Sequence, residues 1–426
     1  MTTTSRIIGV AVAAALLAAS GCAARPAAQA VTGQAMTEQP MTELVWATGG
    51  ITAPAPQAVA DMWNETRPEG PRVRIERMPA QSDDQHRMLA LELGAGVPDL
   101  DVLDLDVVWT ADFAERGWLV DLSDLRPQLE AVSQRAALDS AMWDGTLWAA
   151  PYTTDAGLLF YRKDLVATAP TTWDGLVAEG TRVAAEQGIS PYVVEGAPTE
   201  GLVCGFLELL WGADGAFTIG DDDAVQLDER AAARAMEFLR NGVENGTVLP
   251  GAENMDQEEA RMAFQAGRAV FLRSWPYAFT HFEEDADSAV AGRVGVAPLP
   301  TLTGGPSVAA LGGHNLAVSS YSDSPEAAAE FVRWVSTDLG VQRMLATDFS
   351  LAPAAAAVYA EPSTSPVLRT LSDVLPTARP RPVTPRWSEV SELLQQRIVA
   401  VTSGRTPASE AVGDLRELVG ATVESG

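Results

Sequence analysis

The sequence predicts an α/β protein built as two lobes, each a sheet covered by helices. Short apolar segments with strand spacing alternate with segments of helical spacing in the first part of the chain. A long, mainly helical stretch then separates two strand-rich blocks. The folded part, about 380 residues beginning near Leu44, is long for a single hydrophobic core and suits two.

The first residues predict export. Arg6 precedes an apolar run from Ile7 to Ala19 and then small residues before Cys22, which is the pattern of a cleaved signal peptide, residues 1–21. The run is too short to span a bilayer as a mature helix. The site resembles the lipobox of bacterial lipoproteins, although Ala19 replaces its usual leucine. We therefore expect an acylated Cys22, a flexible tether over residues 22–42 and anchoring to the outer face of the cell membrane. An ordinary secretory signal with an incidental cysteine is the alternative.

The first block of the folded part alternates strands and helices in order. Apolar or alternating segments predict strands at 44–47, 73–75 and 100–107, and helical spacing predicts helices at 58–64, 83–93 and 109–116. Short connections between them predict parallel strands covered on both faces. Ligands of such sheets sit at the carboxyl ends of the strands.

The rest of the folded part returns twice to strand character. Strands are predicted at 145–151, 157–162, 293–298 and 308–319, with mainly helical segments between 163 and about 285. A helix begins at Pro325, and the last 40 residues form two helices, the second starting at Thr406–Pro407. This order predicts a chain that crosses between its lobes more than once.

Charge and cysteine content exclude several classes of function. The net charge of −28 argues against nucleic acid as a partner, because binding phosphates needs a basic surface. Cys204 is the only cysteine besides Cys22, so we expect no internal disulfide and a buried, hydrophobic Cys204.

Four aspartates near the third predicted strand raise the alternative of a metal site. Alternation along a strand places them on different faces, so we expect no shared metal and no cofactor. These aspartates are Asp99, Asp101, Asp104 and Asp106.

Several segments resemble the family 1 extracellular solute-binding proteins of ABC sugar importers. They are LDLDVVW at 103–109, WDGTLWAAP at 143–151, LFYRKDL at 159–165, RMAFQAG at 261–267 and GVAPLP at 295–300. The resemblance implies a Venus-flytrap (type II periplasmic-binding-protein-like) fold with a mixed sheet in each lobe. It places the N-lobe at 43–153 plus about 309–350, and the C-lobe at 154–308 plus about 351–426.

Four further segments are similar to the trehalose/maltose-binding proteins and to the mycobacterial trehalose-recycling lipoprotein within that family. They are EGLVC at 200–204, SWPYAF at 274–279, LGGHNL at 311–316 and PRPVTP at 380–385. This resemblance implies capture of trehalose or a related α-linked disaccharide by a monomer. It also implies delivery of the sugar to ABC permease subunits, with the membrane contacted through the lipid alone.

The chemistry of a disaccharide selects the candidate binding residues. Aromatic planes cover the apolar faces of a sugar, and carboxylates or guanidinium groups bind its hydroxyls. Asp106 ends a predicted strand, where it binds a hydroxyl or caps the next helix. Asp155 lies at the expected crossing between lobes, where it contacts the sugar or stabilises a turn, and Tyr152 beside it either stacks on the sugar or packs in the hinge.

The remaining candidates lie in the second half of the chain. Pro276 interrupts regular structure and turns the rings of Trp275 and Tyr277 outward from a loop, unless they are core residues. Gly312 and Gly313 let backbone N–H groups approach a ligand, and His314 replaces a tryptophan of the similar binders, as a hydrogen-bond donor or a solvent-facing hinge residue. Arg381, held between two prolines, binds hydroxyls or a site carboxylate, or lies on the surface. Glu258 and Glu259 are further candidates by their position in the family, unless they only line the solvated face of the helix that carries Arg261, and His86 is a less supported one.

Two other functions compete with capture of a disaccharide. Another oligosaccharide or a glycerophosphodiester is an alternative ligand, although a phosphate needs more basic groups. A glycoside hydrolase would need two carboxylates across the cleft, yet the sequence contains no recognisable catalytic motif, so we expect no enzyme.

Overall fold

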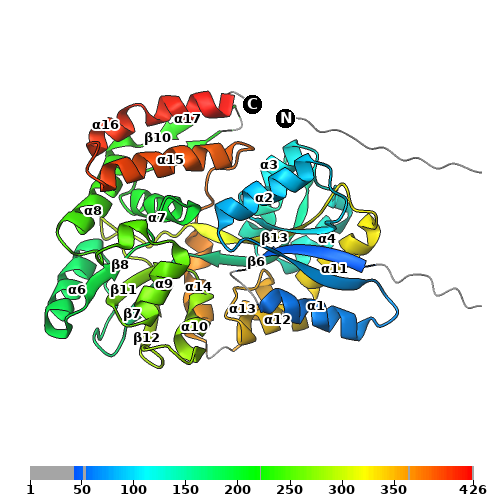
Figure 1. Cartoon of the computed structure of the whole chain (residues 1–426), viewed down its shortest axis with the longest axis horizontal. Coiled ribbons are helices and arrows are strands. Elements are labelled where there is room, and N and C mark those ends of the chain that lie inside the picture. Colours follow the sequence, from blue (N-terminus) through cyan, green and yellow to red (C-terminus); the bar gives the residue numbers. More distant parts are fainter. Residues whose placement is uncertain (1–42, 51–53, 221, 363–364, 425–426) are drawn as a thin grey trace, which may run out of the picture. The chain divides into compact units, whose positions relative to one another are not determined.

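The computed structural model describes residues 43–50, 54–220, 222–362 and 365–424 (Figure 1). The predicted signal peptide, the acylated Cys22 and the predicted tether up to residue 42 lie outside these residues. In the described part of the chain, no helix is both long and apolar enough to cross a membrane.

The first lobe is built on a five-stranded mixed sheet. Its strand order is β2-β1-β3-β13-β6. The strands are β1 (Glu43–Gly49), β2 (Arg72–Met78), β3 (Val102–Asp106), β6 (Ala149–Ala156) and β13 (Leu311–Val318). β1 pairs in parallel with β2 and β3, as the alternation of strands and helices predicts. β13 runs antiparallel to both β3 and β6, which makes the sheet mixed.

The second lobe is built on a four-stranded sheet of order β12-β7-β11-β8. Its strands are β7 (Leu158–Arg162), β8 (Ser190–Val193), β11 (Ala269–Ser274) and β12 (Val294–Ala297). β7 is antiparallel to β11 and β12, whereas β8 is parallel to β11. Two small hairpins complete the strands: β4 (Met142–Trp143) with β5 (Thr146–Leu147), and β9 (Phe217–Ile219) with β10 (Val225–Leu227).

Helices surround each sheet. Those of the first lobe are α1 (Ala55–Thr66), α2 (Ser82–Gly94), α3 (Thr110–Glu115), α4 (Arg126–Val132), α5 (Arg135–Ser140), α11 (Pro325–Thr337) and α12 (Leu339–Asp348). Those of the second lobe are α6 (Trp173–Gln187), α7 (Glu200–Trp211), α8 (Glu229–Glu244), α9 (Gln257–Gln265), α10 (Ala278–Glu284), α14 (Pro366–Val374), α15 (Trp387–Thr402), α16 (Ala408–Gly413) and α17 (Leu415–Glu424). Of these, α15, α16 and α17 pack mainly on α7 and α8 and on one another. The short α13 (Ala356–Tyr359) packs with a smaller apolar cluster. Three 3₁₀ turns lie at Ser123–Leu125, Ala252–Asn254 and Leu375–Thr377.

Each lobe has its own hydrophobic core, and paired strands connect the two cores. β6 contributes Tyr152 to the first core and Ala156 to the second, while β13 contributes Leu316 to the first and Leu311 to the second. The two strands run side by side from one lobe to the other (Figure 1). The chain therefore crosses between lobes more than once, as predicted. The residue limits that the sequence assigns to each lobe stay a prediction.

The mainly helical stretch predicted between 163 and 285 contains strands that the sequence analysis missed. β11 is six residues long and buried throughout, so it shows no alternation. Periodicity alone does not separate such a short apolar run from a buried helical segment. The second of the two predicted C-terminal helices is broken into α16 and α17.

Candidate functional site

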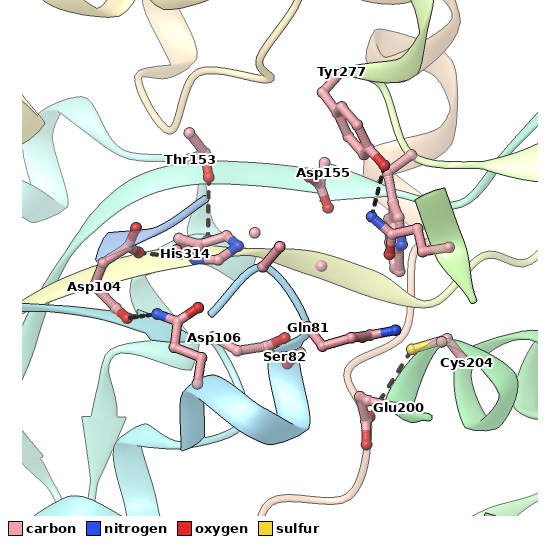
Figure 2. Close-up of a pocket in the computed structure, with 18 of the residues that line it drawn as sticks. Gln81, Ser82, Asp104, Asp106, Thr153, Asp155, Glu200, Cys204, Tyr277 and His314 are labelled. Atoms are coloured by element: carbon pink, nitrogen blue, oxygen red, sulfur yellow. Dashed lines mark hydrogen bonds and ion pairs between the residues drawn. The ribbon is translucent and has the colours of Figure 1, made fainter. Parts of the chain in front are cut away.

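A cavity lies between the two lobes, at the carboxyl edge of the parallel strands. Its volume, with the open mouth included, is about 880 Å³. Its walls come from both lobes, and Figure 2 shows many of their side chains pointing toward a shared space. β1, β3, β6 and β13 supply one wall, and α7, α9 and the ends of β8 and β11 supply the other. The strand-end location expected for a ligand is thus where the cavity is found.

An ion-pair chain crosses the cavity at Arg381. Its guanidinium donates to Oδ1 of Asp106 at 2.8 Å and to Oε1 of Glu200 at 2.8 Å, one carboxylate from each lobe. Arg381 is only 3% exposed, and its Nε has no partner among the described residues. Glu200 also accepts hydrogen bonds from Nε1 of Trp387 at 3.1 Å and from the Ser391 hydroxyl. Arg381 therefore pairs with site carboxylates, one of the roles expected for it, and is not a surface residue.

Asp155 places an unsatisfied carboxylate oxygen in the cavity wall. Its Oδ1 is buried and has no hydrogen-bond partner in the described part of the chain. Burial raises the pKa of Asp155 to about 6, with the Asp106 carboxylate acting in the same direction and His314 opposing both. A buried acceptor without a donor costs about 1–3 kcal/mol. A ligand hydroxyl that donates here recovers that free energy.

Trp275 follows β11 and lines the cavity. The guanidinium carbon of Arg273 lies 4.0 Å from the centre of the Trp275 ring, a cation–π contact. Arg273 is held in turn by two hydrogen bonds to Glu208, at 2.8 and 2.7 Å. A buried ion pair thus supports the ring from the side of the second lobe.

Gly312 and Gly313 occupy positions where an added side chain would clash with its neighbours. An added Cβ at Gly312 would lie 2.2 Å from Oδ1 of Asp155 and 2.6 Å from Cζ3 of Trp275. Gly313 has φ of +114°, and its Cβ would lie 2.4 Å from the carbonyl oxygen of Thr153. Gly312 therefore lets β13 approach Asp155 and Trp275, and Gly313 lets it approach the backbone of β6.

His314 contributes a charged ring to the first-lobe wall. Its Nδ1 lies 2.8 Å from Oδ1 of Asp104, a carboxylate that is 1% exposed. Burial lowers the pKa of His314, but the charge and the hydrogen bond of Asp104 outweigh it and raise the pKa to about 9. Asp104 thus favours the protonated ring, and His314 lines the cavity with its side chain 29% exposed.

The two lobes also touch beside the cavity. The Asp83 carboxylate of α2 accepts a hydrogen bond from the N–H of Glu200, at the first turn of α7, at 3.2 Å. Ser388 and Nε2 of His86 lie 3.1 Å apart, one on each lobe. These contacts link the two lobes beside the cavity. His86, a less supported candidate, is not among the cavity residues.

Comparison with known proteins places the chain in a family. The model of the bacterial extracellular solute-binding proteins matches residues 58–369. A probable ABC transporter-binding protein of Deinococcus radiodurans is 32% identical over 374 residues, which cover 84% of this chain and 87% of the relative. This chain belongs to the bacterial extracellular solute-binding proteins.

Other members of the family, and solved structures, match this solute-binding protein over most of its length. The maltodextrin-binding protein MdxE of Bacillus subtilis is 24% identical over 362 residues, which cover 81% of this chain and 83% of that protein. The structure of maltose-bound MalE3 of T. maritima superposes with a TM-score of 0.83 at 32% identity, covering 89% of this chain and 99% of MalE3. The GacH receptor of Streptomyces glaucescens, at 22% identity and a TM-score of 0.80, shares the fold. The predicted family and two-lobed fold are confirmed.

Most of the candidates predicted from the sequence of this solute-binding protein line its cavity. They are Asp106, Asp155, Trp275, Tyr277, Gly312, Gly313, His314 and Arg381. The expectation of two outward-facing rings holds for Trp275 but is only partly right for Tyr277. Tyr277 is 6% exposed, and its hydroxyl contacts Glu258 and lies 2.8 Å from Nε2 of Gln257.

The structure does not bring Tyr152 and Glu258 into the cavity wall. Tyr152 is 1% exposed and packs edge-on against Trp46 in the core, at 5.6 Å between ring centres. Because successive side chains of β6 alternate between faces, Thr153 and Asp155 face the cavity instead. Glu258 lies behind the wall, where it accepts from the Tyr277 hydroxyl and pairs with Arg261 at 2.9 Å.

Several cavity residues were missed by the sequence analysis. Glu195 follows β8, a strand that was not predicted, and burial raises its pKa to about 7. Glu200 and Cys204 border the cavity from α7, and Cys204 is also buried, as predicted. Asp104 shares the cavity face with Asp106 two residues along β3, a spacing that the sequence does contain. Within the described residues, no group of His, Cys, Asp or Glu is arranged to hold a metal ion.

Proposed function

We propose that this solute-binding protein captures trehalose or a related α-linked disaccharide for an ABC importer. The observation that carries the proposal is the unpaired Oδ1 of Asp155 beside the ring of Trp275 in one cavity. An acceptor for a hydroxyl and an aromatic plane for an apolar sugar face are the two groups that a pyranose needs. The maltose bound to MalE3, at 32% identity, supports a sugar of this size.

The charges of the cavity favour a sugar over a phosphodiester. Five lining carboxylates face two cationic side chains, and both cations already contact carboxylates. A phosphate group would meet this excess of negative charge, whereas hydroxyls donate to it. The carboxylates are Asp104, Asp106, Asp155, Glu195 and Glu200, and the cations are His314 and Arg381.

Isothermal titration calorimetry on the purified folded part tests the ligand. The panel contains trehalose, maltose, a longer maltodextrin and a glycerophosphodiester. We expect saturable binding of an α-linked disaccharide. Saturable binding of the glycerophosphodiester alone would overturn the sugar assignment. We also propose capture without turnover, so that incubation with trehalose or maltose releases no glucose. Sustained glucose release that disappears in Asp155→Ala would show a hydrolase instead.

We further propose that the protein acts as a monomer held at the outer face of the membrane by an acylated Cys22. In this arrangement the closed form docks with the ABC permease subunits. Substituting Cys22→Ser should release the protein from the membrane fraction, which immunoblotting of fractionated cells measures. Continued membrane association of the variant would refute the lipid anchor. Size-exclusion chromatography with light scattering tests the monomer, with and without sugar.

A further inference from the structure

His314 is held by a buried aspartate of the neighbouring strand, Asp104. β13 and β3 are antiparallel neighbours, and Nδ1 of His314 lies 2.8 Å from Oδ1 of Asp104. The second oxygen of Asp104 accepts the Thr48 hydroxyl at 2.5 Å, and its main-chain carbonyl accepts from Nε2 of Gln85 at 2.9 Å. The main-chain N–H of His314 donates to the Thr153 hydroxyl at 3.1 Å. Both members of the pair are therefore fixed in position by three neighbouring elements.

The orientation of the ring assigns a role to its second nitrogen. An ionised carboxylate only accepts hydrogen bonds, so Nδ1 carries the hydrogen that Asp104 receives. Figure 2 shows the other ring nitrogen, Nε2, on the side away from Asp104 and toward the cavity. Among the described residues, Nε2 of His314 has no hydrogen-bond partner. The ring side chain is 29% exposed and lines the cavity, so Nε2 is the ring nitrogen left for a ligand.

The groups around the ring determine its charge. Asp104 and Asp106 face it from β3 and Asp155 from β6, while Arg381 is paired with Asp106. Burial lowers the pKa of His314, and Asp104 more than offsets this, so that the pKa rises to about 9. A doubly protonated ring offers Nε2–H as a donor, whereas a neutral ring bonded to Asp104 through Nδ1–H would offer Nε2 as an acceptor. The aspartate thus decides which kind of hydrogen bond the cavity makes at this point.

We propose that Asp104 and His314 act as a pair that presents a positively charged hydrogen-bond donor to one oxygen of the bound sugar. The proposal rests on the sugar-binding function proposed above and adds a specificity determinant to it. At this point of the wall, the pair selects a ligand with an oxygen acceptor over one with an apolar face. The unpaired Oδ1 of Asp155, farther along the same wall, selects a donor. His314 contacts the sugar, and Asp104 is a positioning residue that acts through it.

The test compares three variants with the wild-type protein between pH 5.5 and 8, with maltose as the probe in calorimetry. Asp104→Asn removes the charge that keeps His314 protonated. His314→Gln keeps a donor without charge. Asp101→Asn is the matched control, because Asp101 is a buried aspartate that precedes β3, is 7% exposed and bonds the Val45 N–H outside the cavity. The ratio of variant to wild-type dissociation constants is reported at each pH, so that titration of other cavity groups cancels.

We expect Asp104→Asn to weaken maltose binding about tenfold at pH 8 and to approach wild-type affinity at pH 5.5, where the ring is protonated without help. The ratio for Asp101→Asn should stay near one throughout, and His314→Gln should show a smaller loss that does not vary with pH. A ratio for Asp104→Asn that is near one at pH 8, or that is raised equally at every pH, would overturn the proposal. The second of these results is the signature of a purely structural aspartate.

A nuclear magnetic resonance titration separates this proposal from the sugar assignment. The chain has three histidines, so the ring signals of His314 in ligand-free protein are assigned by their loss in His314→Gln. We expect a ring that stays protonated beyond pH 8 in the wild type and titrates at least one unit lower in Asp104→Asn. If no sugar of the panel binds, the proposed function fails, and the titration still decides on the pair. A wild-type ring that is neutral at pH 7.5 would refute the charged donor.

Discussion

Substituting Gly312→Ala should damage sugar binding more than it damages the fold. The added Cβ would lie 2.6 Å from Cζ3 of Trp275 and 2.2 Å from Oδ1 of Asp155. Carbon atoms in contact are separated by about 3.5–4.0 Å, so the ring or the strand has to move by roughly 1 Å. The conformation of Gly312 itself is not left-handed, and the effect therefore comes from these two contacts alone.

The two groups that the added Cβ would displace, Trp275 and Asp155, both belong to the proposed binding surface. The cost should therefore appear mainly as a loss of sugar affinity. Overpacking a well-packed position typically costs about 1–3 kcal/mol. Here most of that cost can be relieved by moving Trp275 into the cavity, where it occupies space that the ligand needs. We therefore expect maltose affinity to fall about tenfold to a hundredfold, or about 1.4–2.8 kcal/mol, measured by calorimetry.

Gly205→Ala is the matched control for this experiment. Gly205 lies in α7, and a Cβ added there meets nothing within 4 Å. Replacing a glycine inside a helix should stabilise the fold by about 0.5–1 kcal/mol and leave affinity unchanged. Thermal unfolding of both variants separates stability from binding. Wild-type affinity in Gly312→Ala would refute the reasoning, because it would mean that the ligand contacts neither the Trp275 ring nor the Asp155 carboxylate.

Three further predictions concern the same cavity. Trp275→Ala should weaken sugar binding by about 1–3 kcal/mol in calorimetry, and unchanged affinity with a lower melting temperature would mean that the ring serves the core. Burial raises the pKa of Asp155 to about 6, and a sugar hydroxyl donates best to the ionised carboxylate. Sugar affinity should therefore fall as the pH drops below 6, by at most about tenfold per pH unit. Asp155→Asn should weaken binding at pH 7.5 and reduce this dependence, and an identical pH profile in the variant would contradict the assignment. Asp83→Ala removes a contact between the lobes and should weaken the binding of every sugar by the same factor, about threefold to tenfold. Asp84→Ala on the same helix is the control and should leave binding unchanged. A change in the order of preference among sugars would count against a role of Asp83 in closure.

Much of the fold could be predicted because it depends on local patterns. β1 to β3 and the helices between them have regular spacing and clear ends, and the structure places them within a few residues of the prediction. β8 and β11 could not be found in the same way. β11 is buried throughout, so its residues carry no alternation that would distinguish a strand from a helix. Missing β8 also meant missing Glu195 at its end.

Some residues of the candidate site could likewise be predicted from the sequence, and others could not. Asp106 and Asp155 were found because each lies at or near a strand end, and Arg381 because two prolines hold it in place. Of the two roles left open for Tyr152, packing is the one that the structure shows, since alternation from Asp155 along β6 places its ring on the opposite face, against Trp46. The position of Glu258 could not be predicted for another reason. It lies in the first turn of α9, and only the packing of Tyr277 against that helix shows that it supports the wall from behind.

The sequence by itself determined the family, the two-lobed α/β architecture and most residues of the cavity wall. These depend on short-range spacing and on segments that related proteins share. Tertiary structure decided what each polar group does. His314 and Asp104 are 210 residues apart in the chain, and Arg381 meets Glu200 across 181 residues. The charge of a buried ring or the pairing of a carboxylate depends on groups within a few ångströms. The pairing of β13 with β3 brings His314 to Asp104, and the packing of the segment 380–385 against α7 brings Arg381 to Glu200.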